Sequence, residues 1–233
     1  MRVAAPPIPR SPPPQHLPVK GKPHQPVSFT IATVNDDFTD HKTNLHRVKA
    51  AVVLAQETKN TDVHKVHPRT DTFGVHQNTT RVDQAGTSVI WNKDRVNAGK
   101  RGYALGVRPQ GAKMENRWIN FTDVNIDGAK VRMVSVHRPP KRYSRLWADF
   151  DRNLAAFVKR SLLPVIVGMD ANQANPRRMA HLTGLRWHAP KGSIDGFLAT
   201  RGIKFENLRR APKGSSDHNP VLAKVTIRRA LLP

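Results

Sequence analysis

Acidic, amide and histidine side chains recur in this sequence at the ends of short apolar segments, where a β-strand would stop. Such segments are ended or followed by Asn35, Asp37, Glu57, His137, Asp170 and Asn172; Asp195 lies inside one of them, and Asp217 and His218 precede the last. A strand end is held rigidly by the core and opens to solvent, which suits a preorganised chemical site. The sequence therefore predicts that these side chains gather in one site at a sheet edge.

The acids of this set point to a metal site. Glu57, Asp170 and Asp217, with Asp37 or Asn35, would form an all-oxygen cluster of the kind that Mg²⁺ or Mn²⁺ prefers. The chain has only 17 acids against 39 lysines and arginines. Any one acid alone could be a cap or turn residue. Together they would repel one another unless a cation lay between them, so we expect Mg²⁺ or Mn²⁺ as the cofactor.

A histidine precedes the last apolar segment. Asp217 and His218 are adjacent, and on extended backbone their side chains point to opposite faces, so we expect no pairing between them. Asp195 is the natural residue to orient His218. An imidazole held by a carboxylate can stay protonated near neutrality and neutralise phosphate charge.

The chain is strongly basic, with a formal net charge of +22 over 233 residues. This charge attracts polyanions, but by itself it fits nucleic acid, an anionic membrane or a merely solvated surface. Basic and aromatic residues flank the candidate motifs and are predicted to bind substrate: Arg138, Lys141, Arg142, Tyr143, Arg177 and Arg178 come after a motif histidine or aspartate, and Lys213 precedes the last motif. Their positions favour a nucleic-acid partner, DNA more than RNA, over a small phosphomonoester or a lipid.

Composition also limits the cellular setting. The absence of cysteine excludes disulfides and thiolate metal sites. We find neither an apolar signal-peptide core nor a run of about 20 apolar residues, so we expect a cytoplasmic monomer without a membrane span. Residues 1–26 hold nine of the 19 prolines and no acid, which predicts a disordered basic arm. Residues 27–229 would then form one catalytic domain.

The apolar pattern predicts more strands than helices. Strands are expected over 28–34, 51–55, 87–91, 118–126, 130–137, 165–167, 193–199 and 221–227, and helices after residue 39, over 146–157 and from Asn175-Pro176. Asp127-Gly128 is a pair that a type I′ hairpin turn prefers, and residues 58–84 are expected to be loop. Helices fall between pairs of strands, which suggests a four-layer α/β/β/α sandwich.

Six segments, in order, resemble one known motif series. They are TVNDD (33–37), LAQETK (54–59), VSVHRPP (134–140), VIVGMDANQANP (165–176), SIDGF (193–197) and SSDHNPV (215–221). The series resembles that of the endonuclease/exonuclease/phosphatase superfamily, which includes deoxyribonuclease I-like enzymes. The resemblance implies two mostly antiparallel sheets packed together with helices outside. It also implies metal-dependent phosphodiester hydrolysis by in-line attack of an activated water, most typically by an endonuclease.

The resemblance further implies a role for each residue. Glu57 would be the principal metal ligand, with Asn35 and Asp37 nearby and Asp217 on the metal side. Asp170 would position or deprotonate the attacking water, and Asn172 would hold a phosphate oxygen. His137 would contact the scissile phosphate. Asp195 would orient His218, which would stabilise the transition state.

The sequence departs from this series in places and leaves alternatives open. Gly196 stands where relatives often have tyrosine, and the carboxylate partner of His137 is not evident, with Asp71 and Asp83 as candidates. The short interval between Asn172 and Asp195 suggests a plain, open groove without lesion specificity. A phosphatase or phospholipid phosphodiesterase of the same superfamily remains an alternative. So does a catalytically inactive nucleic-acid-binding module, against which the intact site residues argue.

Overall fold

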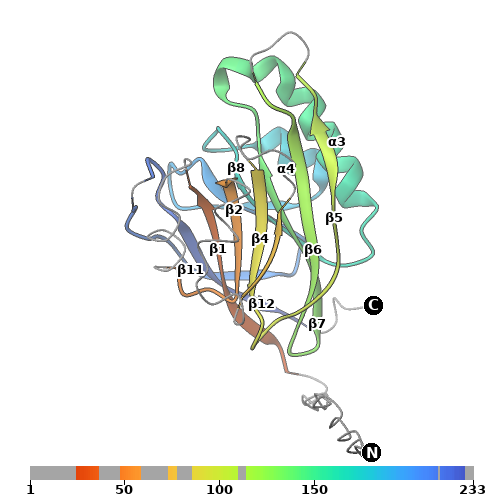
Figure 1. Ribbon diagram of the computed structural model, residues 1–233, viewed down its shortest axis with the longest axis vertical. Coiled ribbons are helices and arrows are strands. Elements are labelled where there is room, and N and C mark those ends of the chain that lie inside the picture. The colour runs from red at the N-terminus through yellow and green to blue at the C-terminus, as the bar shows by residue number, and fades with distance from the viewer. Residues whose placement is uncertain are drawn as a thin grey trace, which may run out of the picture.

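Two six-stranded sheets pack face to face in the computed structural model, which describes residues 25–36, 48–58, 73–77, 86–109, 114–214 and 216–228 (Figure 1). The first sheet contains, in spatial order, β11 (Lys204–Arg210), β12 (Val221–Ile227), β1 (Val27–Asn35), β2 (Val52–Thr58), β4 (Gly86–Asn92) and β3 (Phe73–Gln77). The second contains β5 (Asn97–Val107), β6 (Arg117–Ile126), β7 (Ala129–His137), β8 (Val165–Asp170), β10 (Asp195–Ala199) and β9 (Arg186–His188).

Each sheet has one parallel pair at its centre and is otherwise antiparallel. β1 runs parallel to β2, and β7 runs parallel to β8. The carboxyl ends of each parallel pair therefore lie side by side, and His137 is directly in register with Asp170. This topology brings the polar residues that follow four different apolar segments to one edge of the sandwich.

The main core lies between the two sheets. Ile31 and Leu54 of the first sheet pack with Met133, Ile166 and Phe197 of the second, all of them fully buried. Strands covered on both faces are mostly apolar, which explains why β2 and β8 begin in the sequence as continuous apolar runs and turn polar only at their ends.

At Gly168, β8 of the second sheet packs closely against β2 of the first. A Cβ atom added at Gly168 would lie 2.6 Å from the Leu54 side chain. Only glycine leaves room for this contact, so a side chain at this position would push the two strands apart.

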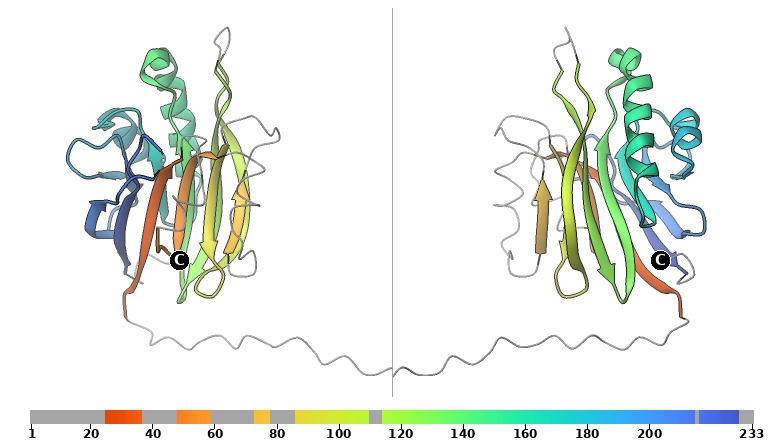
Figure 2. Two further views of the ribbon diagram at one scale, coloured as in Figure 1. Left: turned by 60° about the vertical axis from the view of Figure 1, so that its left-hand side comes forward. Right: turned by 90° about the vertical axis from the view of Figure 1, so that its right-hand side faces the viewer.

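A layer of helices covers the outer face of the second sheet (Figure 2). The layer consists of the 3-10 helix η1 (Lys141–Leu146), α3 (Trp147–Lys159) and α4 (Arg177–Thr183). α3 is buried through Phe150, Leu154 and Val158, which pack against residues of β6, β7 and β8. The helix ends at Lys159, before Pro164, and α4 begins after Pro176 without a side-chain cap from Asn175.

The predicted hairpin between β6 and β7 is confirmed. Asp127 has φ 50° and Gly128 has φ 87°, the two positive values that a type I′ turn requires. The Asn125 side-chain oxygen accepts a hydrogen bond of 3.0 Å from the Gly128 amide and closes the turn.

Several elements differ from the sequence prediction. Residues 73–77 form β3, although residues 58–84 were expected to be loop, and β5, β9 and β11 were not predicted. These strands lie at or next to the sheet edges, where one face meets solvent and no apolar run is needed; β5, for example, is mostly exposed. The arm and the helix expected after residue 39 lie almost entirely outside the described residues. Among the residues that are described, no helix is both long and apolar enough to cross a membrane.

Candidate active site

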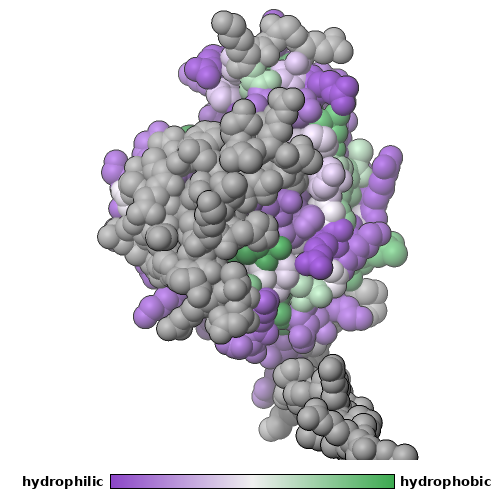
Figure 3. Space-filling model, viewed as in Figure 1, coloured by the Kyte–Doolittle hydropathy of each residue, from purple (hydrophilic) through white to green (hydrophobic). Residues whose placement is uncertain are grey.

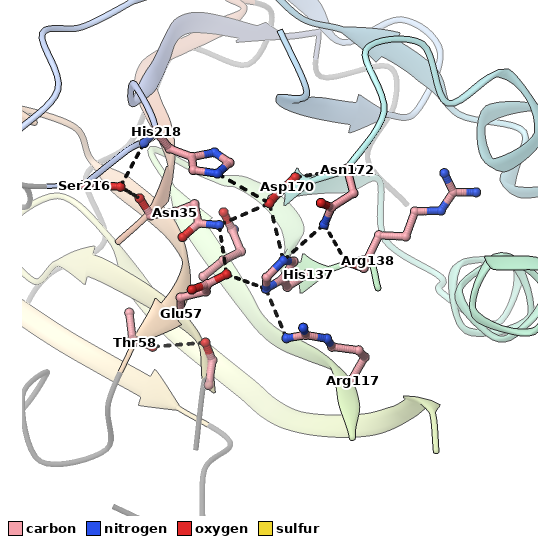
Figure 4. Close-up of polar contacts among 12 residues, drawn as sticks. Asn35, Glu57, Thr58, Arg117, His137, Arg138, Asp170, Asn172, Ser216 and His218 are labelled. Carbon is pink, nitrogen blue, oxygen red and sulfur yellow. Dashed lines mark hydrogen bonds and ion pairs between the residues drawn. The ribbon is translucent and has the colours of Figure 1, made fainter. Parts of the chain in front are cut away.

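Asn35 joins two carboxylates from opposite sheets at the site edge (Figure 4). Its side-chain nitrogen donates to Asp170 Oδ2 at 3.1 Å and to Glu57 Oε1 at 3.3 Å. Asn35 ends β1, Glu57 is the last residue but one of β2, and Asp170 ends β8. Three of the predicted residues thus share one cluster. Asp37 lies outside the described residues.

A β-bulge directs Glu57 into this cluster. The register between β2 and β4 shifts between Gln56 and Thr58, and Glu57 adopts φ 55°, in the left-handed region. Gln56 and Thr58 are fully buried, while the Glu57 side chain is partly exposed at the site. A bulge re-aims one side chain at the end of a strand, and backbone strain of this kind is common at functional sites.

His137 lies between the two carboxylates. Its Nε2 is 3.3 Å from Asp170 Oδ2, and its Nδ1 is 3.5 Å from Glu57 Oε1. Asn172 Nδ2 is 3.2 Å from the same Nε2 atom. The structure therefore supplies the carboxylate neighbours that the sequence left open, and they are residues of the site itself. Asp71 and Asp83 lie outside the described residues.

Arg117 is a further site residue, which the sequence analysis missed. Its guanidinium Nη1 lies 3.2 Å from His137 Nδ1, and the side chain is buried. Arg117 begins β6, and the residue before the predicted strand 118–126 was not considered as a candidate. Because β6 is antiparallel to β7, its amino end lies at the edge where β7 ends. That rule of antiparallel pairing could have identified Arg117 once the hairpin was predicted.

Asn172 is fixed by its main chain and its side chain. It adopts φ 51°, and its amide donates to Asp170 Oδ1 at 2.7 Å. Its side-chain nitrogen donates to the Arg138 carbonyl oxygen at 2.8 Å. Asparagine tolerates the left-handed region better than most residues, which suits it to this tight turn after β8.

His218 and Asp195 form the closest histidine–carboxylate contact of the site. His218 Nδ1 lies 2.8 Å from Asp195 Oδ2, and His218 Nε2 lies 3.9 Å from Asp170 Oδ2. Asp217 Oδ1 is 3.6 Å from the same nitrogen, so the expectation that Asp217 and His218 point apart is wrong. Residues 216–218 form a bend, and the alternation of side chains along an extended strand does not apply there.

Ser216 ties this bend to the first sheet. Its hydroxyl donates to the Asn35 carbonyl oxygen at 2.8 Å and accepts from the His218 amide at 3.1 Å. The loop that carries His218 is thereby anchored to the end of β1.

The charges around His218 favour its protonated form. Burial lowers the pKa of the imidazole, but the hydrogen bond to Asp195 and the charges of Asp195, Asp170 and Asp217 outweigh it and raise the pKa to about 9. Burial acts to raise the pKa of Asp170, yet contacts with His137 and His218 lower it overall. Asp170 is therefore an ionised acceptor at neutral pH.

The donor set suits a hard divalent cation. Ligand atoms of Asp170, Asp195 and His218 all lie within 4.8 Å of one another, a group that could hold a metal ion. A protonated His218 would repel a cation, however. Glu57 and Asp170 offer carboxylate oxygens, and Asn35 would offer its side-chain oxygen if its amide group were rotated so that Oδ1 instead of Nδ2 faced them. The group of Glu57, Asp170 and Asn35 is therefore the better match for Mg²⁺.

The predicted substrate-binding residues divide into two groups. Lys141, Arg142, Arg177, Arg178 and Lys213 are exposed, and Tyr143 is partly exposed. Arg138 is different, because its side chain is almost completely buried and pairs with Asp151. Figure 4 shows it pointing away from His137 and Asp170. The prediction that Arg138 binds substrate is therefore wrong for this conformation.

Solved structures with the same fold belong to the endonuclease/exonuclease/phosphatase superfamily. A family member from Bacteroides vulgatus superposes with a TM-score of 0.68 at 12% identity over 85% of this chain and 98% of its own. D. rerio TDP2, solved with a single-strand DNA product, gives 0.68 at 15% identity, with the same coverage of both chains. A mannosyl-6-phosphatase from Bacteroides thetaiotaomicron gives 0.64 at 11% identity, covering 84% of this chain and 98% of its own.

The fold is thus the deoxyribonuclease I-like fold that the motif series implied. No protein-family model matches the sequence, and no curated protein matches it either. The likeness lies in the three-dimensional arrangement rather than in overall sequence identity.

Proposed function

We propose that this protein is a divalent-metal-dependent phosphodiesterase that cuts nucleic acid, DNA in preference to RNA. The observation that carries the proposal is the cluster of Asn35, Glu57, His137, Asp170 and His218 at one edge of the sandwich. A bound Mg²⁺ or Mn²⁺ supplies charge neutralisation at the phosphate and lowers the pKa of water. Glu57 and Asn35 would hold it, with Asp217 and Asp37 as further oxygen donors.

The protein's own groups would prepare the attack of water. Asp170 is ionised and can accept a proton or a hydrogen bond from a water molecule beside it. The main-chain N–H of Asn172 is bonded to Asp170, and its side-chain amide would orient a phosphate oxygen. His137 lies between both carboxylates and would contact the scissile phosphate.

His218 would stabilise the charge that develops on the phosphate. Its protonated ring carries positive charge at neutral pH, and Asp195 holds that ring in place through Nδ1. Nε2 is the atom that faces Asp170 and the reaction centre. Preorganised charge of this kind costs no reorganisation during the reaction.

The surface charge supports nucleic acid as the substrate. The net charge is +22, and the described surface in Figure 3 is mostly hydrophilic on the face shown. Arg177, Arg178, Lys141 and Arg142 are exposed on helices that follow the strands bearing His137 and Asp170. One structural neighbour was solved with single-strand DNA, whereas another is a sugar phosphatase. A phosphomonoesterase is therefore the competing function.

The deciding experiment is incubation of purified protein with supercoiled plasmid in Mg²⁺, in Mn²⁺ and in EDTA, beside the Asp170→Ala variant. We expect metal-dependent nicking that Asp170→Ala abolishes. A parallel assay with p-nitrophenyl phosphate tests the competing function. Turnover of the monoester without nicking would assign a phosphatase. A retarded plasmid band without cleavage would assign a binding module.

A further inference from the structure

A polar groove adjoins the catalytic histidine on the side of Asp195. It has a volume of about 330 Å³ and is lined by residues 192–195, Arg210 and residues 217–219. This size falls within the range of about 300–1,000 Å³ typical of small-ligand sites. His218 and Asp195 both contribute to the lining, so any group in the groove lies next to the proposed reaction centre.

Arg210 is one of the residues that line this groove. It is the last residue of β11 and pairs in register with Val221 of β12, which fixes its main chain. Its Nη2 donates to the Lys191 carbonyl oxygen at 3.3 Å, which links the end of β11 to the loop before β10. The side chain is exposed, and because this hydrogen bond uses one N–H, the guanidinium retains most of its five N–H donors.

Both acids of the groove face His218. Asp195 holds His218 Nδ1 at 2.8 Å, and Asp217 faces His218 Nε2 at 3.6 Å. Among the described residues, Arg210 forms no ion pair with a carboxylate. An exposed guanidinium without an acidic partner, lining the same groove as His218, is suited to bind a second phosphate.

We propose that this groove is a second phosphate subsite, in which Arg210 binds the phosphate next to the scissile one on the same nucleic-acid strand. The inference rests on the proposed function and deepens it. The preferred substrate is then a chain with at least two consecutive phosphates, rather than an isolated diester or a terminal monoester.

The test compares two substrates that differ in the number of phosphates. Bis(p-nitrophenyl) phosphate has only the scissile group, whereas a short single-stranded DNA with a fluorophore and a quencher has neighbours on both sides. For Arg210→Ala we expect kcat/KM on the DNA to fall about ten- to a hundredfold, mainly through KM. This loss should exceed any loss on the diester at least tenfold. Arg210→Lys should recover part of it.

Arg201→Ala is the matched control, because Arg201 is also an exposed arginine but lies beyond the opposite end of β11. It should leave both activities unchanged. Equal losses of Arg210→Ala on the two substrates, or no loss on DNA, would overturn the subsite while leaving the proposed function standing. Wild-type protein that hydrolyses the diester but no DNA would overturn both proposals.

Discussion

Arg138 and Asp151 form a bidentate ion pair that is shut off from solvent. Arg138 Nη2 lies 2.6 Å from Asp151 Oδ2, and Arg138 Nε lies 3.1 Å from Asp151 Oδ1. The guanidinium also stacks on Trp147 at 4.0 Å and donates to the Gln173 side chain at 2.9 Å. The pair joins the segment after β7 to α3, and through Gln173 it reaches the turn that carries Asn172.

This pair predicts a positioning role for Arg138. Its carbonyl accepts the Asn172 side chain, so loss of the ion pair should displace Asn172 and His137 together. Arg138→Ala should cost about 3–5 kcal/mol of unfolding free energy, because Asp151 would be left buried and unpaired. Urea denaturation measures this cost, and a variant as stable as wild type would contradict it. The double variant Arg138→Met/Asp151→Leu should regain most of the stability, yet kcat should stay low with little change in KM.

The location of the metal is the second prediction. Glu57→Gln should weaken Mn²⁺ binding at least tenfold, as measured by electron paramagnetic resonance of free Mn²⁺, because one of the carboxylates beside Asn35 is removed. Asp195→Asn should affect Mn²⁺ binding much less, because Asp195 is bonded to His218. The reverse order would place the ion among Asp170, Asp195 and His218 instead. Circular dichroism of both variants provides the folding control.

The pH profile should report the ionisation of His218. Because the pKa is raised to about 9, the imidazole is protonated at neutral pH and loses its charge as the pH rises through that value. The value of kcat/KM at fixed Mg²⁺ should therefore fall above about pH 9. Asp195→Asn removes a hydrogen bond and a charge that raise the pKa, so the alkaline limb should move to lower pH. An alkaline limb at the same pH in both proteins would exclude His218 as its source.

Arg117 should be needed for activity although no sequence motif contains it. Its removal takes away the cation that lies 3.2 Å from His137 Nδ1. We expect Arg117→Ala to lower kcat/KM at least tenfold. Arg132→Ala is the matched control, since Arg132 also sits in the second sheet but pairs with Asp123 at the other end of the hairpin. Similar losses in the two variants would mean that Arg117 acts only through stability.

The sequence by itself determined the central strands and the polar residues that flank them. β8 and the first four residues of β2 are apolar because both of their faces are buried, and that constraint is local enough to be visible in a single segment. Asn35, Glu57, Asp170 and His218 could therefore be selected without coordinates. The edge strands β3 and β11 could not be predicted, because a half-exposed strand needs no apolar run.

Only the tertiary structure decided which of the selected side chains meet. Arg138 follows His137 directly and shares its basic context with Lys141, yet it turns inward because Asp151 of α3 offers it a buried partner. Arg117 joins the site from the amino end of an antiparallel strand. Both outcomes depend on how strands pair and on which helix covers them. These long-range contacts are fixed by packing of the whole domain and leave no local pattern in the sequence.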